Sequence, residues 1–203
     1  MSKIHVKRIL RKRLRVKPRI LSEDRVYQEL RRVLGKSWPI RFYADRRSHI
    51  SFLDSRWILV DTAYFPYMFV EAVRETLGVP CQQVLYQMGV RVGSVVAKRY
   101  ADKGLSGDPL ILTAAAVAAR LGWGLLYPIE LGEKSFQVIG YNTFESDSYL
   151  RNKARSKGSA CFFLAGVIAG LAQHYYNRPC EVREVKCRAR GNAFCLFKGS
   201  VLQ

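Results

Sequence analysis

The sequence lacks an apolar segment long enough to cross a membrane, which takes about 20 residues in a helix. The stretch 161–172 is apolar throughout but only 12 residues long, and the stretch 109–131 is interrupted by Arg120 and Pro128. These lengths favour a soluble protein over a membrane-spanning one. With 203 residues, 49% of them hydrophobic, the chain is long enough for one globular domain with a sizeable core.

Acidic residues are missing from the first 20 positions, although the chain holds 16 of them. This N-terminal arm instead carries nine of the 34 Lys and Arg residues and half of the formal net charge of +18. The nine are Lys3, Lys7, Arg8, Arg11, Lys12, Arg13, Arg15, Lys17 and Arg19. Such a block repels itself and cannot bury a core, so we expect an extended arm at 1–20 that binds an anionic partner.

Several partners would satisfy the arm: RNA, DNA, an anionic membrane surface, an acidic protein or a large assembly. A solvated tail is the alternative, and a transit peptide is disfavoured because the arm has little serine. Aromatic residues are absent from the arm as well, so base stacking would have to come from elsewhere. We therefore expect salt-dependent tethering, helped by Arg46, Arg47 and the basic residues within 151–157.

Histidine is scarce, and no catalytic constellation stands out. The three histidines are His5, His49 and His174, and a Gly-x-Gly-x-x-Gly dinucleotide-binding motif is absent. These absences weigh against acid–base catalysis and against a self-sufficient reductase. We expect a non-catalytic protein.

Cysteine is the informative residue type. Five cysteines form an odd set, and Cys81 and Cys180 are predicted to be free thiols in a reducing, cytoplasmic compartment. Glu184, Cys187 and Cys195 lie within 12 residues, a spacing that suits a zinc site, and a helix carrying Cys161 could supply a fourth ligand. Buried thiols without a metal are the alternative.

A metal site here makes one structural demand. Strand alternation would send Glu184 and Cys187 to opposite faces, so the strand must bulge or end between them. Nearby cations would offset the net charge of minus two that three thiolates, one carboxylate and one divalent cation carry. The basic residues in reach are Arg183, Lys186, Arg188 and Arg190.

Periodicity and turn signals predict an α+β domain, with helices packed on a mainly antiparallel sheet. The segment 21–47 holds a helix over 22–35 and a strand over 39–44, and a further strand is predicted at 57–61. Helices follow at 66–77, 80–101, 109–121 and 161–176. Strands are predicted at 123–130, 135–141 and, as a closing hairpin, 180–187 with 193–198, while 142–157 is predicted as a basic loop. Gly89 and Gly93, and likewise Gly166 and Gly170, are four apart on one helix face and predict close packing within the molecule.

The C-terminal motif resembles the 4-vinyl reductase domain family. It combines Cys161-Phe-Phe-Leu-Ala-Gly with Glu184-Val-Lys-Cys-Arg-Ala-Arg-Gly-Asn-Ala-Phe-Cys-Leu-Phe. The resemblance covers about 48–201 and implies a zinc-containing domain over 48–203. It implies zinc ligands at Cys161, Glu184, Cys187 and Cys195, and a fold shared with subunits of vesicle-tethering complexes, which often dimerise, so a homodimer is expected.

The resemblance also implies a ligand. Relatives bind small aromatic molecules in an internal cavity, and this chain has an aromatic set on converging elements. The expected pocket residues are Phe65, Phe69, Tyr86, Trp123, Phe136 and Tyr141. The leading expectation is a sensor or carrier of a small hydrophobic molecule. The alternatives are an enzyme or carrier in tetrapyrrole ((bacterio)chlorophyll) synthesis and an accessory protein that binds nucleic acid or a large assembly.

Overall fold

The computed structural model describes residues 50–52, 55–78, 80–152 and 155–203. The basic arm, the helix expected at 22–35, the strand expected at 39–44, and Arg46 and Arg47 lie outside the described residues.

A four-stranded antiparallel sheet forms one layer of the molecule. Its strands are β3 (Leu125–Leu131), β4 (Ser135–Tyr141), β5 (Cys180–Lys186) and β6 (Cys195–Val201), in the spatial order β3-β4-β6-β5. Successive residues of a strand point to opposite faces, and in β4 Phe136 and Val138 point into the main core.

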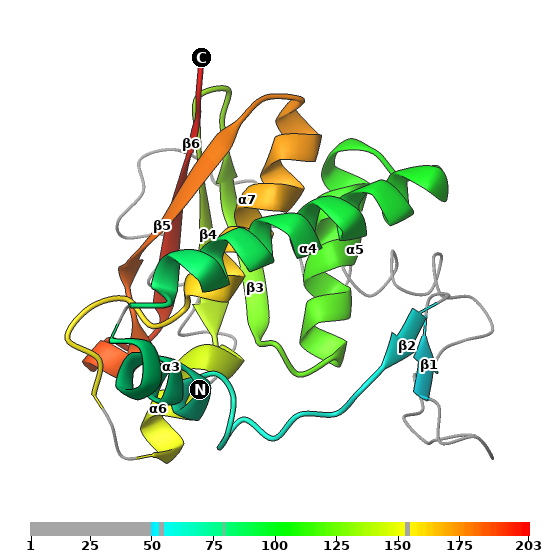
Figure 1. The fold of residues 1–203 in the computed structure, drawn as a ribbon. Helices are drawn as coiled ribbons and strands as arrows, with labels where there is room; N and C mark the ends of the chain where they lie inside the picture. The colour runs from blue at the N-terminus through cyan, green and yellow to red at the C-terminus, as the bar shows by residue number, and fades with distance from the viewer. Residues whose placement is uncertain (1–49, 53–54, 79, 153–154) are drawn as a thin grey trace.

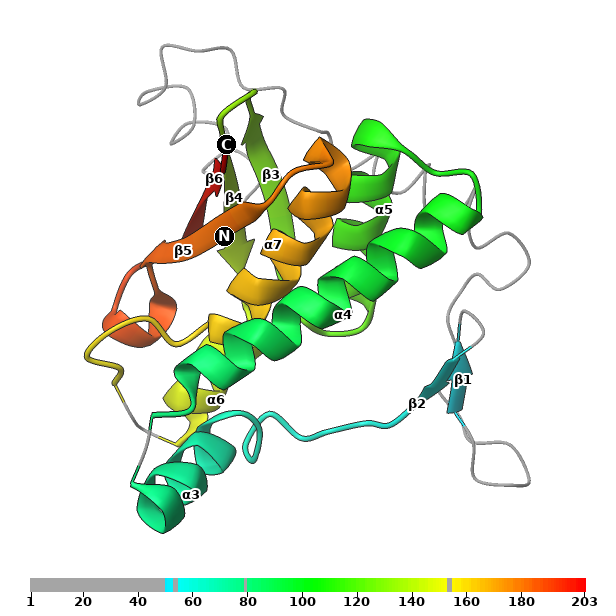
Figure 2. The same ribbon diagram turned by 45° about the horizontal axis from the view of Figure 1, so that its top comes forward.

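Five helices form the rest of the described domain. They are α3 (Tyr67–Leu77), α4 (Gln82–Asp102), α5 (Gly107–Arg120), α6 (Phe144–Arg151) and α7 (Phe162–Tyr176). Helix α7 lies against the sheet, and α4 crosses α7 on the side away from the strands (Figure 1, Figure 2). The α+β architecture is as the sequence predicts. None of the described helices has the length and apolarity needed to cross a membrane.

Helices α4 and α7 approach each other through glycine. A Cβ on Gly89 would lie 2.1 Å from the carbonyl oxygen of Phe163, and one on Gly166 would lie 2.0 Å from the carbonyl oxygen of Tyr86. The four predicted glycines therefore face one another across one helix–helix contact, as expected. This contact holds α7 at a fixed height over the sheet.

Two segments differ from the sequence-based expectation. The basic loop expected at 142–157 contains α6, which begins after Thr143 and has Glu145 and Asp147 in its first turn. Helix α6 lacks an apolar stripe because its buried face is polar, so periodicity could not reveal it.

The strand expected at 57–61 is also placed differently. Strand β2 (Ser55–Trp57) pairs with β1 (Ile50–Phe52), and the chain then leaves the hairpin. The side chains of Ile58 and Leu59 are 76% and 70% exposed. A β-branched apolar run predicts a strand, but here it has no neighbour among the described residues with which to pair.

Candidate metal centre and ligand cavity

Three cysteines and a glutamate converge at the start of α7. One ligand atom from each of Cys161, Glu184, Cys187 and Cys195 lies within 4.8 Å of all the others, and all four residues are buried. Cys161 immediately precedes α7, Glu184 lies in β5, Cys187 directly follows β5, and Cys195 opens β6. The Sγ atoms of Cys161 and Cys195 are 3.7 Å apart.

The predicted irregularity in β5 is present. The pairing of β5 with β6 shifts register between Glu184 and Lys186. The extra residue turns the chain so that the side chains of Glu184 and Cys187 reach the same side. The prediction of a bulge between these two residues is confirmed.

Glu184 presents one satisfied and one unsatisfied oxygen. Its Oε2 accepts hydrogen bonds from the backbone N–H groups of Ala160 at 2.9 Å and Cys161 at 3.1 Å. Its Oε1 is buried and has no hydrogen-bond partner. A buried carboxylate oxygen without a partner is costly, and a cation would remove that cost. The donor set therefore fits a metal ion.

The charges of the cluster point the same way. Burial raises the pKa of Glu184 to about 7 and raises that of Cys161 well above its ordinary value. Hydrogen bonds with the Cys161 and Cys195 thiols instead lower the pKa of Cys187 to about 4. Four acidic groups cannot all ionise in one dry site unless a cation compensates them.

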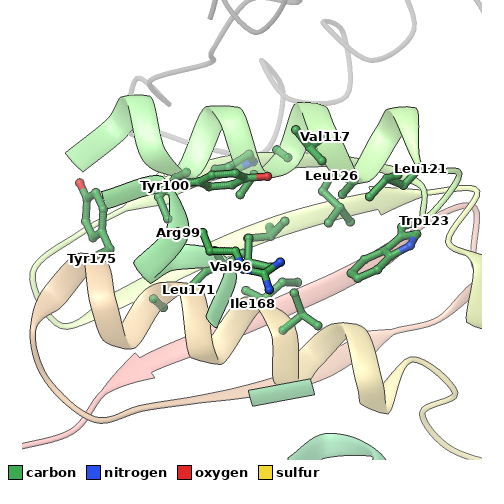
Figure 3. Close-up of a pocket in the computed structure, with 18 of the residues that line it drawn as sticks. Val96, Arg99, Tyr100, Val117, Leu121, Trp123, Leu126, Ile168, Leu171 and Tyr175 are labelled. Carbon is green, nitrogen blue, oxygen red and sulfur yellow. The ribbon is translucent and has the colours of Figure 1, made fainter. Parts of the chain in front are cut away.

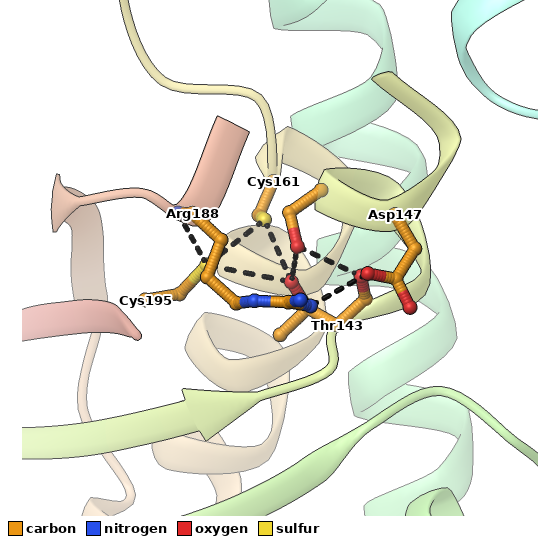
Figure 4. Close-up of polar contacts among 6 residues, drawn as sticks. Thr143, Asp147, Cys161, Arg188 and Cys195 are labelled. Carbon is orange, nitrogen blue, oxygen red and sulfur yellow. Dashed lines mark hydrogen bonds and ion pairs between the residues drawn. The ribbon is translucent and has the colours of Figure 1, made fainter. Parts of the chain in front are cut away.

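A polar shell surrounds the sulfur atoms (Figure 4). The Oγ1 of Thr143 lies 3.3 Å from the Sγ of Cys161 and 3.4 Å from that of Cys195, and it also contacts Ser146 Oγ at 2.7 Å. The backbone N–H of Arg188 donates to the Sγ of Cys195 at 3.5 Å. Such outer contacts orient the groups that hold a metal.

Of the four basic residues expected near the cluster, Arg188 makes these contacts. Its guanidinium group donates to Asp147 Oδ1 of α6 at 2.6 Å, which ties the hairpin to α6 beside the cysteines. Arg183 pairs instead with exposed Glu181, and Lys186 lies over the ring of Phe194.

Glu145 is a second buried carboxylate at the same helix end, and sequence reasoning missed its role. Its Oε1 accepts from the N–H of Phe163 at 2.9 Å, and its Oε2 accepts from the N–H of Leu164 at 2.8 Å. Burial raises the pKa of Glu145 to about 8, against the effect of these two hydrogen bonds. The signal in the sequence was the segment 142–145, noted only for its family resemblance.

A cavity of about 350 Å³ lies between the helices and the sheet (Figure 3). Its walls come from α4, α5, α7, β3 and β4, with Trp57 of β2 added. Tyr175 and Trp123 lie toward opposite ends of the cavity in Figure 3. The lining is mainly aliphatic and aromatic, and the charged residues that line it are Arg99, Asp102 and Lys103. These three side chains are exposed, so the charges lie at the rim and the interior is apolar.

With this geometry in hand, comparison with known families gives a match to the 4-vinyl reductase domain over residues 141–201. The chain carries a 4-vinyl reductase domain. The matched segment includes all four residues of the metal cluster, together with Thr143, Glu145 and Arg188. The resemblance noted in the sequence is thereby confirmed.

Relatives and solved structures agree with this assignment. An uncharacterized protein of Methanocaldococcus jannaschii is 26% identical over 135 residues, which is 65% of this chain and 73% of the relative. The phenol-responsive sensory domain of the transcription activator PoxR, solved with phenol, superposes with a TM-score of 0.74 at 18% identity, covering 89% of this chain and 92% of that domain. A vinyl-4-reductase family protein of M. jannaschii gives a TM-score of 0.51 at 16% identity, covering 72% of this chain and 85% of that protein. These likenesses show a shared fold.

The 4-vinyl reductase domain places the six expected pocket residues in different surroundings. Trp123 and Phe136 line the cavity. Phe65 and Phe69 are outside its lining and contact each other beside Phe144, with ring centroids 5.9 Å apart for Phe65 and Phe69.

The other two expected pocket residues are also outside the lining. The hydroxyl of Tyr86 accepts from the N–H of Val182, and Tyr141 packs against Tyr127 and Phe194. Sequence reasoning did not foresee the α5 wall of the cavity, which is made of small and aliphatic side chains. The run of buried residues from Leu112 to Ala118 is the signal that could have indicated it, since a helix buried all round lies inside a domain.

Proposed function

We propose that this 4-vinyl reductase domain is a non-catalytic binding module that holds a small hydrophobic molecule in the cavity between α4, α5, α7 and the sheet. The observation that carries the proposal is the cavity itself, with its apolar interior and its charges at the rim. Ligand sites are mostly apolar, with a few polar groups that fix orientation. A volume of about 350 Å³ is at the lower end of the range for ligand pockets, which favours a small molecule over a tetrapyrrole macrocycle.

An aromatic ligand fits the lining best. Trp123, Phe136 and Tyr176 contribute rings to the walls, and Tyr100 adds a fourth. Aromatic pairs gain energy from offset or edge-to-face contact beyond that of area alone. The structure of the PoxR sensory domain with phenol, which shares this fold, supports the same ligand class.

We further propose that the metal cluster holds a structural zinc ion. Thiolate sulfur and carboxylate oxygen suit zinc, and Cys161, Glu184, Cys187 and Cys195 would fill a tetrahedral shell. Such a shell leaves no position for a reacting water. The ion would join the closing hairpin to the start of α7, and the chain's own residues would hold and orient it.

The ligand proposal is tested by calorimetric titration of the full chain with phenol and a panel of substituted phenols. Ala118 lines the cavity from α5, whereas its neighbour Ala119 does not. Ala118→Leu should reduce affinity at least about tenfold because the added carbons occupy ligand volume, and Ala119→Leu should leave it unchanged. Equal affinity in both variants, or no binding by the wild-type chain together with no small hydrophobic molecule retained in native mass spectrometry, would contradict the proposal.

A further inference from the structure

The face of the sheet that points away from the helices has an ordered composition. Because residues paired directly across strands point to the same side, the register defines rows on this face. One row runs Arg183, Lys198, Gln137 and Glu130 across β5, β6, β4 and β3. The next row runs Lys186, Leu196, Ile139 and Tyr127 across the same four strands. Tyr141 of β4 pairs with Leu125 of β3 in the row beyond.

Three aromatic rings form a continuous strip on this face. The ring centroids of Tyr127 and Tyr141 are 6.1 Å apart, and those of Tyr141 and Phe194 are 5.9 Å apart. The three side chains are half-buried and pack over Ile129 and Ile139, so each ring is supported from below. A strip of supported aromatic rings on an open sheet is a stacking surface for flat molecules.

Cations border the aromatic strip. The Nζ of Lys186 lies 5.3 Å from the centroid of the Phe194 ring. Arg183 and Lys198, both exposed, pair directly across β5 and β6. Like charges in this relation destabilise a sheet, and the contact of Arg183 with Glu181 at 3.3 Å is an exposed ion pair that offsets little. An anion placed between Arg183 and Lys198 would remove the repulsion.

We propose that this outer face of the sheet binds single-stranded nucleic acid, with bases stacked on Tyr127, Tyr141 and Phe194 and phosphates held by Arg183, Lys186 and Lys198. Single strands are recognised on proteins by aromatic side chains that stack with bases beside a positively charged surface. A duplex keeps its bases paired and offers this strip nothing to stack on. The formal net charge of +18 adds long-range attraction for a polyanion.

Two acids also lie on or beside this face and limit where the backbone can run. Glu130 accepts a hydrogen bond from the Nε2 of Gln137 at 2.5 Å, at the β3 edge, and Glu181 lies beside Arg183. The phosphates therefore follow the β5–β6 side, and the bases lie across Phe194, Tyr141 and Tyr127. The binding face is opposite the ligand cavity, so it is a function separate from the one proposed above.

Fluorescence anisotropy of the full chain with a labelled mixed-sequence RNA tests this assignment, with DNA of the same sequence and its duplex as competitors. Tyr141→Ala should weaken binding of the single strand about 5- to 100-fold, because losing one stacked base is worth about 1–3 kcal/mol. Tyr141→Phe keeps the ring and should keep the affinity. Phe69→Ala is the matched control, since Phe69 is exposed on α3, far from this face in sequence and packing. Lys198→Gln should lower the salt dependence by about one released counterion.

Three outcomes would overturn the assignment. The first is single-strand binding that Tyr141→Ala and Phe194→Ala leave unchanged while both variants keep their melting temperature. The second is equal competition by duplex and by heparin, which would mean attraction by charge alone. The third is binding to vesicles of anionic phospholipid by a chain that does not bind the RNA, which would make the face a membrane-contact surface.

Discussion

At the start of α7, two buried carboxylates replace the side-chain cap that Cys161 does not supply. Glu184 accepts the N–H groups of Ala160 and Cys161, and Glu145 accepts those of Phe163 and Leu164. Negative charge at a helix N-terminus is favoured by the helix dipole, which offsets part of the cost of burying the carboxylates. The same helix end thus positions Cys161 beside the other sulfurs.

Replacing Glu145 by glutamine tests this cap. The amide nitrogen cannot accept a hydrogen bond, so one of the two N–H groups, of Phe163 or Leu164, loses its partner in a buried site. We expect Glu145→Gln to lower the free energy of unfolding by about 1–3 kcal/mol in urea denaturation. Glu133→Gln, at an exposed bend, should change it by less than about 0.5 kcal/mol. Equal effects of the two changes would remove the capping role.

The metal cluster gives a second test at single residues. Cys187→Ser removes one proposed zinc ligand, whereas Cys180→Ser changes a buried thiol of the same hairpin outside the cluster. Purified wild-type chain and Cys180→Ser should hold about one equivalent of zinc by elemental analysis, and Cys187→Ser less than half. The melting temperature should fall with the loss of zinc, since metal binding contributes to folding. Less than half an equivalent in the wild type, with melting unchanged in Cys187→Ser, would contradict a structural zinc ion.

Much of this residue-scale picture follows from the sequence, because three of the four cluster residues are close in the chain. Glu184, Cys187 and Cys195 belong to one hairpin, and a hairpin converts short spacing into spatial contact. The roles of Thr143 and Glu145 could not be read in this way. Their partners lie 18 to 52 positions away, and only the packing of α6 against α7 and the hairpin brings them together.

At the scale of elements, the contact of α4 with α7 determines the height of the cavity. Gly89 and Gly93 of α4 meet Gly166 and Gly170 of α7, with backbone atoms where side chains would otherwise stand. The small-residue spacing predicted close packing, and the helix lengths followed from apolar periodicity. Helix α6 escaped prediction because its buried face carries Glu145, Ser146 and Ser148, which are polar and therefore give no hydrophobic periodicity.

An alanine at Gly89 should disturb this contact. Its Cβ would stand 2.1 Å from a backbone oxygen of α7, which cannot move away without shifting the helix. We expect Gly89→Ala to destabilise the domain by about 1–3 kcal/mol in thermal or urea denaturation, as overpacking does. Gly158→Ala is the matched control, because a Cβ there would meet nothing within 4 Å. A Gly89→Ala variant as stable as Gly158→Ala would show that the helices separate easily.

At the scale of the whole molecule, the sheet separates two surfaces of different character. One side faces the helices and the apolar cavity, and the other carries the aromatic strip and its bordering cations. The sequence could not place the cavity, because its walls come from five elements and from Trp57, and a pocket exists only after these are packed. For the same reason, Tyr141 was grouped with the pocket although it points to the outer face. Alternation along β4 shows this once the direction of Phe136 is known.

The N-terminal arm adds a charge effect that depends on its composition alone. Deleting residues 1–20 removes nine Lys and Arg residues and no acid, and halves the formal net charge of +18. Affinity for a polyanion falls with salt in proportion to the number of phosphates neutralised. We expect the deletion to weaken binding to heparin and nucleic acid at low salt and to flatten its salt dependence. Phenol binding in the cavity should stay unchanged, since the described cavity lining begins at Trp57.

Pull-downs from host lysate with the full chain and the deletion, each at low and high salt, complete the test. The full chain should recover anionic partners that high salt removes, and the deletion should recover fewer of them even at low salt. Because the arm has no aromatic residue, it should add affinity without preference for single strands, while Tyr141→Ala should remove the preference and leave the charge effect. The two changes should therefore act independently and additively in free energy. If the deletion recovers the same partners with the same salt response, the arm only solubilises the chain.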